Sequence, residues 1–169
     1  MKKIVLVLVL LFSGTLFAQE INKIMVDPDL KSDILIGRCN REGLNLPPFS
    51  SFFNEFYAKY SPDENIVKQL KKKTGDLKIL VLMGTWCDDS REQVPAFFKV
   101  LDGLKFSDSK VEIISVNRKK TGGDVDVSGL NIERVPTFIF YRNDREIGRI
   151  IEKPSSTLEK SMLLILSQE

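Results

Sequence analysis

The spacing of apolar and polar positions predicts a regular series of elements in the C-terminal half of the chain. Residues 78–83 are mostly apolar and rich in β-forming side chains, as in a buried strand, and residues 94–101 place apolar side chains at helical spacing. Three further strands are predicted at residues 110–116, 137–141 and 146–151, with a turn joining the last two. An amphipathic helix follows Pro154-Ser155-Ser156. This order predicts an α/β fold with a mixed central sheet flanked by helices.

Residues 19–75 are predicted to form an irregular arm followed by two helices, packed on the core as an extension. The arm contains short apolar pieces separated by turn formers, and one short strand is expected at residues 34–36. Pro47-Pro48 then opens a helix whose aromatic residues recur every three or four positions, and this stripe is interpreted as cover for the sheet. The next helix is expected to have Ser61 as its N-cap and to run to about Lys73.

The first residues of the chain, 1–18, have the order of a secretory signal peptide. Lys2 and Lys3 precede an apolar run, and cleavage is expected after Ala18. The run is shorter than the about 20 residues that a membrane-spanning helix needs, so export is favoured over anchoring. Leu16 fits the small-residue position before the cleavage site poorly, which leaves an uncleaved anchor as the alternative. We expect an exported protein of the periplasm or cell envelope, without stable membrane insertion after cleavage.

The composition excludes several classes of function. Loss of the two lysines of the signal segment lowers the formal net charge from +2 to zero, and acidic and basic residues are mixed along the rest. Nucleic acid is therefore not an expected partner. The chain has two cysteines and no histidine, which removes the catalytic triads that need an imidazole base and the common zinc sites. No metal site and no cofactor is predicted.

One cysteine, Cys87, lies between the strand at residues 78–83 and the helix that follows it. The first N–H groups of a helix lack intrahelical partners and carry partial positive charge, which can stabilise a thiolate. The adjacent Asp88 and Asp89 disfavour a further negative charge, whereas Arg91 favours it. The sequence does not decide between these effects.

Three features in a fixed order resemble the thioredoxin family. Trp86-Cys87-x-x-Ser90 follows the strand, Pro95 lies where the family's active-site helix carries a kinking proline, and Val135-Pro136 precedes the hairpin as the family's cis-proline does. The resemblance implies a thioredoxin fold, with residues 76–169 as the thioredoxin-like domain. The chain is most similar in type to exported thiol-disulfide oxidoreductases, but its motif is Cys-x-x-Ser.

The resemblance implies a role for each residue of the motif. The Cys87 thiolate would attack a disulfide and form a mixed disulfide, which Ser90 cannot resolve, although its hydroxyl could donate a hydrogen bond to the thiolate. Trp86 would flank and shield the thiol, with an ordinary core tryptophan as the alternative. A cis bond at Val135-Pro136 would place Val135 beside the thiol and leave its backbone free to pair with an extended peptide.

A second departure from the family lies in the strand before the motif. Thioredoxins carry a buried aspartate six residues before the first cysteine, where it assists proton transfer during resolution, and Val81 occupies that position here. The absence of this group agrees with the absence of the second cysteine. The protein is therefore not expected to be a general dithiol reductase that works through a disulfide within the motif.

The other sulfur of the chain belongs to Cys39, and three interpretations of it stay open. It is a resolving thiol carried by the arm, a partner of Cys87 in a structural disulfide that leaves Cys87 unreactive, or a buried free thiol. The first interpretation requires the arm to fold over the motif and to bring the two sulfur atoms within reach of each other.

The leading functional hypothesis is thiol-disulfide exchange with Cys87 as the nucleophile, either by a monothiol mechanism or with Cys39 as a distant resolver. Its expected partners are cysteine-containing envelope proteins or a low-molecular-weight thiol. The alternative is a redox-inactive thioredoxin-like module that binds peptides, or acts as a chaperone, through the groove between Trp86 and Val135-Pro136. A third hypothesis is a structural accessory domain that docks through its aromatic helix.

Overall fold

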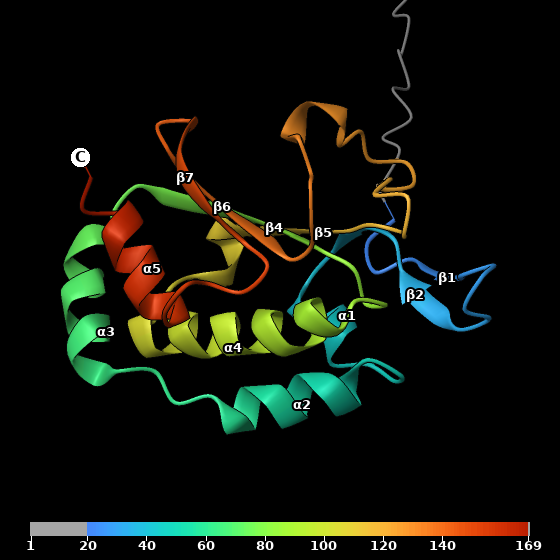
Figure 1. Ribbon diagram of the computed structural model, residues 1–169, viewed down its shortest axis with the longest axis horizontal. Coiled ribbons are helices and arrows are strands. Elements are labelled where there is room, and N and C mark those ends of the chain that lie inside the picture. Colours follow the sequence, from blue (N-terminus) through green and yellow to red (C-terminus); the bar gives the residue numbers. More distant parts are fainter. Residues whose placement is uncertain (1–19, 169) are drawn as a thin grey trace, which may run out of the picture.

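The structure is a computed structural model that describes residues 20–168. The predicted signal peptide, residues 1–18, lies outside the described residues. Figure 1 shows a central sheet with the longer helices packed on one side and a long connection on the other. Among residues 20–168, no helix combines the length and the apolar character that crossing a membrane requires.

The central sheet follows the predicted order of elements and gains one strand from the N-terminal arm. Over the described residues its strands lie in the order β3 (Gly37–Cys39), β5 (Val111–Ser115), β4 (Leu77–Met83), β6 (Thr137–Arg142) and β7 (Arg145–Ile151). β4 and β5 run parallel, with α4 (Asp88–Leu104) as the crossover between them, and the other neighbouring pairs are antiparallel. The predicted α/β fold with a mixed sheet is confirmed.

Helices α2 to α5 cover one face of this sheet. α4 packs on the strands, and the ring centroid of its Phe97 lies 4.4 Å from that of Phe138 in β6. α2 (Ser50–Lys59) packs against α4, and α3 (Glu64–Leu70) contacts both α4 and α5 (Leu158–Ile165). Shorter helices are α1 (Arg41–Leu44) and the 3₁₀ turns Lys71–Lys73, Asp108–Lys110 and Ser128–Leu130.

The sheet separates two apolar clusters, because successive side chains of a strand point to opposite faces. The larger cluster lies between the sheet and the helices and includes Ile79 and Val81 of β4. The smaller cluster lies on the other face, where Leu80 and Leu82 meet residues of the connection between β5 and β6 such as Val127. The two clusters matter for function because the two cysteines belong to different ones.

The aromatic stripe forms cover, as predicted, and it reaches the sheet through α4. Phe49 and Phe53 are buried, and the ring centroid of Phe53 lies 6.0 Å from that of Phe98 in α4. Phe52 and Tyr57 are partly buried against the same cluster. The stripe is therefore part of the core.

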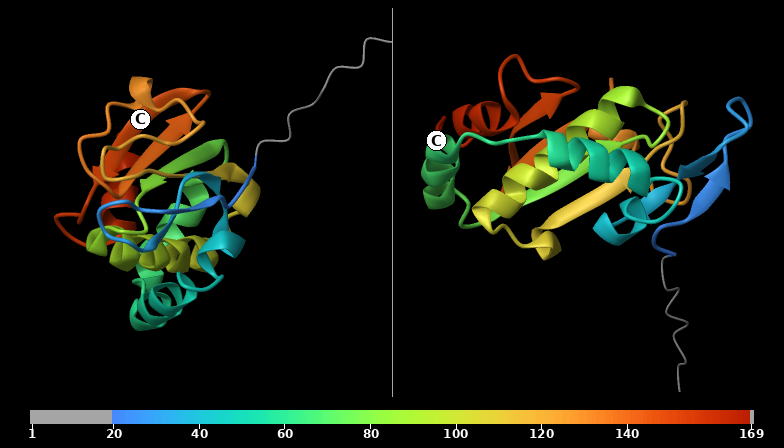
Figure 2. Two further views of the ribbon diagram at one scale, coloured as in Figure 1. Left: turned by 90° about the vertical axis from the view of Figure 1, so that its right-hand side faces the viewer. Right: turned by 90° about the horizontal axis from the view of Figure 1, so that it is seen from below.

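The N-terminal arm is more regular than predicted. β1 (Ile24–Val26) and β2 (Asp33–Leu35) form an antiparallel hairpin that projects from one end of the molecule (Figure 2), and β3 then joins the central sheet beside β5. The strand expected at residues 34–36 corresponds to β2, and a break at Ile36 separates β2 from β3, which the sequence did not predict. Gly37 permits the change of direction, since its φ of 80° lies in the left-handed region that glycine adopts without strain.

The start of α3 also differs from the prediction. Its N-cap is Asp63 and not Ser61, and the Asp63 carboxylate accepts hydrogen bonds from two N–H groups of the first turn. The cause is a tertiary contact with α5. The Asp63 N–H donates to one carboxylate oxygen of Glu159 at 3.0 Å, and the Tyr60 hydroxyl donates to the other at 2.7 Å. These two bonds keep the residues before Glu64 outside the helix.

Candidate functional site

Cys87 lies at the N-terminus of α4, directly after the turn that follows β4. It is the N-cap residue, with an extended backbone, and its N–H donates to the Gly84 carbonyl at 2.9 Å. The Arg91 N–H donates to the Cys87 carbonyl and closes the first turn of the helix. Cys87 therefore directly precedes the first N–H groups of a 17-residue helix, whose partial positive charge stabilises an anion, although its side chain makes no capping hydrogen bond to them.

The thiol of Cys87 faces the segment before β6. Its Sγ donates a hydrogen bond to the Val135 carbonyl oxygen over 3.2 Å, while the Cys87 side chain stays partly exposed. The peptide bond between Val135 and Pro136 is cis. The fold thus brings the predicted nucleophile into contact with the predicted peptide-binding backbone. The Val135 carbonyl therefore accepts a hydrogen bond from the thiol, whereas the family resemblance implied a backbone free to pair with a peptide.

Trp86 lies beside the thiol and is fixed by a hydrogen bond. Its Nε1 donates to the Val116 carbonyl at 2.8 Å, and its partly buried ring packs with Cys87 against the smaller cluster. A glycine is needed at position 84, because a Cβ there would lie 2.5 Å from Trp86 Nε1. Trp86 therefore packs next to Cys87, and the shielding role that the resemblance implied stays a prediction.

Ser90 points into the protein. Its side chain is buried, and its Oγ accepts a hydrogen bond from the Gly84 N–H at 3.2 Å. Within residues 20–168, no hydrogen bond joins Ser90 to Cys87. Ser90 therefore closes the turn between β4 and α4, and its predicted bond to the thiolate stays a prediction.

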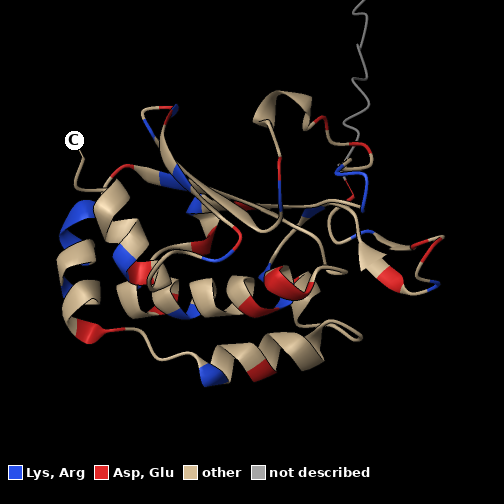
Figure 3. Ribbon diagram, viewed as in Figure 1, with Lys and Arg blue, Asp and Glu red and all other residues tan. Residues whose placement is uncertain are grey.

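Each carboxylate of the first turns of α4 has a cation nearby. Figure 3 shows the acidic residues gathered at this end of the helix. Lys153, which follows β7, places its Nζ 3.3 Å from Asp89 and 3.0 Å from Glu92, and Arg91 lies 3.7 Å from Asp88. The Asp88 side chain is 97% exposed, so solvent screens its charge. Lys153 therefore offsets part of the negative charge that Asp89 and Glu92 place near Cys87. The sequence alone did not decide how the acidic and basic residues near this thiol balance.

A family model described as thioredoxin matches residues 51–163, which is more than half of the chain. The chain belongs to the thioredoxin family. The matched range contains both Cys87 and the Val135–Pro136 bond. Membership of this family suggests a thiol-disulfide redox function.

Individual thioredoxins and related structures are similar over parts of the chain. A TPR repeat-containing thioredoxin of Arabidopsis thaliana is 32% identical over 91 residues, which are 54% of this chain but only 22% of the relative. A protein of unknown function from Pseudomonas aeruginosa superposes with a TM-score of 0.50 at 15% identity, over 72% of this chain and 76% of its own. Fasciola hepatica thioredoxin gives a TM-score of 0.40 at 17% identity, over 60% and 88%. The Pseudomonas structure shares the fold.

Cys39 lies in β3 and packs with a different apolar cluster from Cys87. Its side chain is 5% exposed and belongs to the cluster under the helices, whereas Cys87 packs against the other cluster. Both thiols are free. Burial raises the pKa of the Cys39 thiol to about 12, although a hydrogen bond with the Ser115 backbone lowers it. β3 would have to leave the sheet for Cys39 to reach Cys87, so the structure agrees with a buried free thiol and not with a structural disulfide.

Val81 occupies the position of the family's buried aspartate and is part of the core. It is fully buried in β4 between Ile113 of β5 and Phe138 of β6. A carboxylate at this position would have to lie among apolar side chains of the larger cluster. Val81 therefore contributes packing, and no proton acceptor, to the thioredoxin site.

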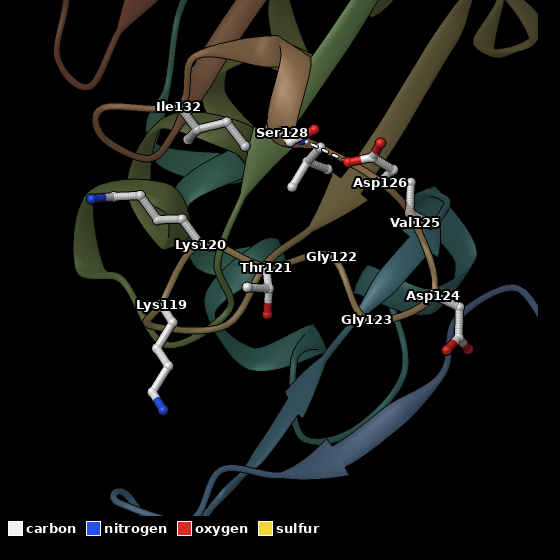
Figure 4. A pocket seen from close by; sticks show the side chains of 11 residues that line it. Lys119, Lys120, Thr121, Gly122, Gly123, Asp124, Val125, Asp126, Ser128 and Ile132 are labelled. Atoms are coloured by element: carbon white, nitrogen blue, oxygen red, sulfur yellow. Dashed lines mark hydrogen bonds between the residues drawn. The ribbon is translucent and has the colours of Figure 1, made fainter.

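A pocket of about 600 Å³ adjoins the site in the connection between β5 and β6 (Figure 4). Val127 and Ile132 line it and also belong to the cluster that includes Trp86 and Cys87. Figure 4 shows that the lysine and aspartate side chains around it point in different directions. A site for one small ligand needs a few polar groups that converge, and this pocket does not present them.

Two residues of the site were not identified from the sequence. Thr85 is buried, its Oγ1 accepts a hydrogen bond from the Leu35 N–H at 3.1 Å, and its carbonyl accepts one from Arg91 Nε at 2.6 Å. Lys153 is the other, through its contacts with the first turns of α4. The fold alone brings Leu35 and Lys153 to the motif, so no local pattern could have indicated them.

Proposed function

We propose that this member of the thioredoxin family carries out thiol-disulfide exchange with Cys87 as the nucleophile and by a monothiol mechanism. The observation that supports this best is the partly exposed Cys87 thiol at the N-terminus of α4, hydrogen-bonded to the Val135 carbonyl. A structural cysteine would be expected among apolar side chains, as Cys39 is. The placement of Cys87 suits a thiol that reacts with another molecule.

The reaction begins when Cys87 releases its proton to solvent. The thiolate attacks one sulfur of a partner disulfide, a bond between Cys87 and that sulfur forms as the partner's S–S bond breaks, and the departing thiolate takes up a proton. The N–H groups at the start of α4 stabilise the attacking thiolate. Because the Val135 carbonyl loses its donor, it becomes free to accept an N–H from an extended partner chain.

The mixed disulfide is then resolved by a thiol from another molecule. Ser90 carries no sulfur, and Cys39 lies buried under the helices. An incoming thiolate attacks the sulfur that is bound to Cys87, and Cys87 leaves as the thiolate. Because the chain supplies no accessible second thiol, we assign Cys39 no resolving role.

The proposed setting of this reaction is the periplasm or cell envelope. Cleavage of the signal segment after Ala18 would give a mature protein that begins at Gln19. The partners would be cysteine-containing envelope proteins or a low-molecular-weight thiol. The intact mass of the protein recovered from its own cells tests this, and a chain that retains Met1 would contradict cleavage.

Titration with Ellman's reagent tests the exchange reaction itself. The native protein should release about one equivalent of the coloured thiolate and carry one mixed-disulfide adduct, at Cys87. A Cys39→Ala variant should behave in the same way, and a Cys87→Ala variant should release none while it stays folded. The proposal is wrong if native Cys87 reacts no faster than the cysteine of an unstructured peptide with the same motif.

A redox-inactive peptide-binding module is the second candidate, and one observation favours it. Ile24, Val26 and Leu30 of the β1–β2 hairpin are 46%, 59% and 44% exposed, and clustered apolar exposure marks interaction surfaces. The hairpin lies at the same end of the molecule as the motif, since the Leu35 N–H donates a hydrogen bond to Thr85 Oγ1. If the Cys87→Ala variant bound an apolar peptide as tightly as the native protein, and Cys87 were unreactive, this candidate would replace the first.

A further inference from the structure

Two buried hydroxyl groups hold the backbone of Leu35. The Leu35 N–H donates to Thr85 Oγ1 at 3.1 Å, and the Leu35 carbonyl accepts a hydrogen bond from Ser115 Oγ at 2.8 Å. All three residues are no more than 1% exposed. Removing one partner of such a bond leaves a buried polar group unpaired, which destabilises the folded state. Both bonds therefore fasten the end of β2 to the sheet.

Thr85 differs from Ser115 in what else it contacts. Ser115 is the last residue of β5, whereas Thr85 lies two residues before Cys87 in the turn after β4. The Thr85 carbonyl accepts a hydrogen bond from Arg91 Nε, and the Arg91 guanidinium lies 5.7 Å from the ring centroid of Phe52 in α2. Thr85 thus connects the N-terminal strands, the motif turn and the first turn of α4.

We propose that Thr85 is a positioning residue for the thiol-disulfide exchange of Cys87, and that the β2–β3 segment sets the orientation of the thiol through it. The inference rests on the proposed function. Without the bond between Leu35 and Thr85, the turn can move, and Cys87 moves relative to the N–H groups of α4. A thiolate displaced from those groups is less stabilised, because the effect of a helix terminus falls off within one turn.

Three variants separate positioning from simple stabilisation. Thr85→Val removes the hydroxyl with little change in side-chain volume, Thr85→Ser keeps the oxygen, and Ser115→Ala removes the matched bond to Leu35 without touching the turn. The alkylation rate of Cys87 with iodoacetamide is measured at about pH 7 and about pH 10, which lie on either side of the ordinary pKa of a cysteine thiol. The ratio of the two rates reports the thiolate fraction and cancels differences in access.

The inference predicts different outcomes for the matched variants. Thr85→Val should lower the rate ratio by about two- to fivefold, the size expected when a thiolate loses the stabilisation of a helix terminus, and Thr85→Ser should restore most of it. Ser115→Ala should lower the free energy of unfolding by about as much as Thr85→Val does, but it should leave the rate ratio at the native value. A native ratio in Thr85→Val, or an equal fall in Ser115→Ala, would overturn the inference.

Hydrogen exchange of the native protein gives a second test that needs no variant. If Thr85 couples the segments, the Leu35 and Cys87 N–H groups should exchange through one opening event and respond equally to low concentrations of urea. Exchange of the Cys87 N–H that is about tenfold or more faster, with a different response to urea, would contradict the coupling. Failure of the proposed function looks different, since native Cys87 would then be unreactive at neutral pH in every variant.

Discussion

The thiol of Cys87 and the carbonyl of Val135, 48 positions apart in the chain, are joined by a hydrogen bond of 3.2 Å. Only a protonated thiol can donate this bond, so a Cys87 thiolate would leave the Val135 carbonyl without it. Loss of the proton therefore creates the nucleophile and frees the backbone acceptor in one event. In the proposed mechanism, attack on a disulfide and pairing with the chain that carries it are coupled through this proton.

The two cysteines should differ sharply toward alkylating reagents. Because burial raises the pKa of Cys39 to about 12, its thiol stays protonated at neutral pH, and its side chain is only 5% exposed. Peptide mass spectrometry after brief treatment with iodoacetamide should find label on Cys87 only, with Cys39 labelled after unfolding in urea. Comparable labelling of both cysteines in the native protein would mean that β3 opens readily and that a resolving role for Cys39 must be reconsidered.

Introducing a thiol at position 90 should change the stoichiometry of the exchange. Ser90 lies in the first turn of the helix that begins after Cys87, so Ser90→Cys places a second sulfur near the mixed disulfide. The variant should release about two equivalents from Ellman's reagent and lose two protons by mass, whereas the native protein releases about one. Ser90→Ala serves as the control and should match the native protein. A single equivalent from Ser90→Cys would show that the buried orientation of residue 90 prevents resolution.

Lys153 should support the reactivity of Cys87 through its contacts with Asp89 and Glu92. In Lys153→Met both carboxylates lose this cation, so at low salt the alkylation rate at neutral pH should fall by up to about threefold, in line with the modest strength of exposed ion pairs. Asp89→Asn in the same background should restore part of the rate, and high salt should remove the difference. The exposed Lys160 provides the control, since Lys160→Met should have no effect.

Glu159 should make the stability of the protein depend on pH. Burial alone would raise the pKa of its carboxyl group, but hydrogen bonds from Tyr60 and the Asp63 N–H outweigh this and hold the pKa below the ordinary 4.5. Because the pKa of this carboxyl group is lower in the folded state than in the unfolded state, the carboxylate stabilises the fold at pH values above the unfolded-state pKa. This stability is lost as the pH falls through the folded-state pKa. Glu159→Gln should therefore lower the free energy of unfolding in urea by about 1–3 kcal/mol at neutral pH.

The same comparison at acid pH should show a smaller difference between Glu159→Gln and the native protein, because the native carboxylate is then protonated as well. Glu55→Gln is the matched control, since Glu55 pairs with Lys59 on the exposed side of α2 and should contribute less than about 1 kcal/mol. An equally large difference at both pH values would show that the Glu159 contacts do not depend on its charge.

The sheet and the helix after the motif could be predicted because their signals are local. β4 is an apolar run because both of its faces are buried. Val94 and Leu101 of α4 recur at helical spacing because one face of that helix is buried. The N-terminal arm was harder, because β3 is short and is stabilised by pairing with β5, which lies far away in the sequence. The cap of α3 was misplaced for the same reason, since Glu159 satisfies the Asp63 N–H from another helix.

Some parts of the candidate site could likewise be predicted from the sequence, and others could not. Cys87, Trp86 and the Val135–Pro136 bond could be predicted because their order along the chain resembles a known family, and the fold brings them together. The support of the turn by Thr85 and Leu35 could not, since it depends on a contact between segments 50 positions apart. The separation of Cys39 from Cys87 depends on which face of β3 points to the helices, and the arm gave no alternation long enough to fix it.

The redox state of Cys87 in protein taken from its own cells tests the central claim most directly. Cells are quenched with acid, free thiols are blocked, and the blocked, unreduced protein is analysed by mass spectrometry. Exchange by a monothiol mechanism predicts a fraction of Cys87 in a mixed disulfide with a partner cysteine or a low-molecular-weight thiol, and Cys39 entirely free. Cys87 recovered only as the free thiol under oxidising growth, or a disulfide between Cys39 and Cys87, would contradict it.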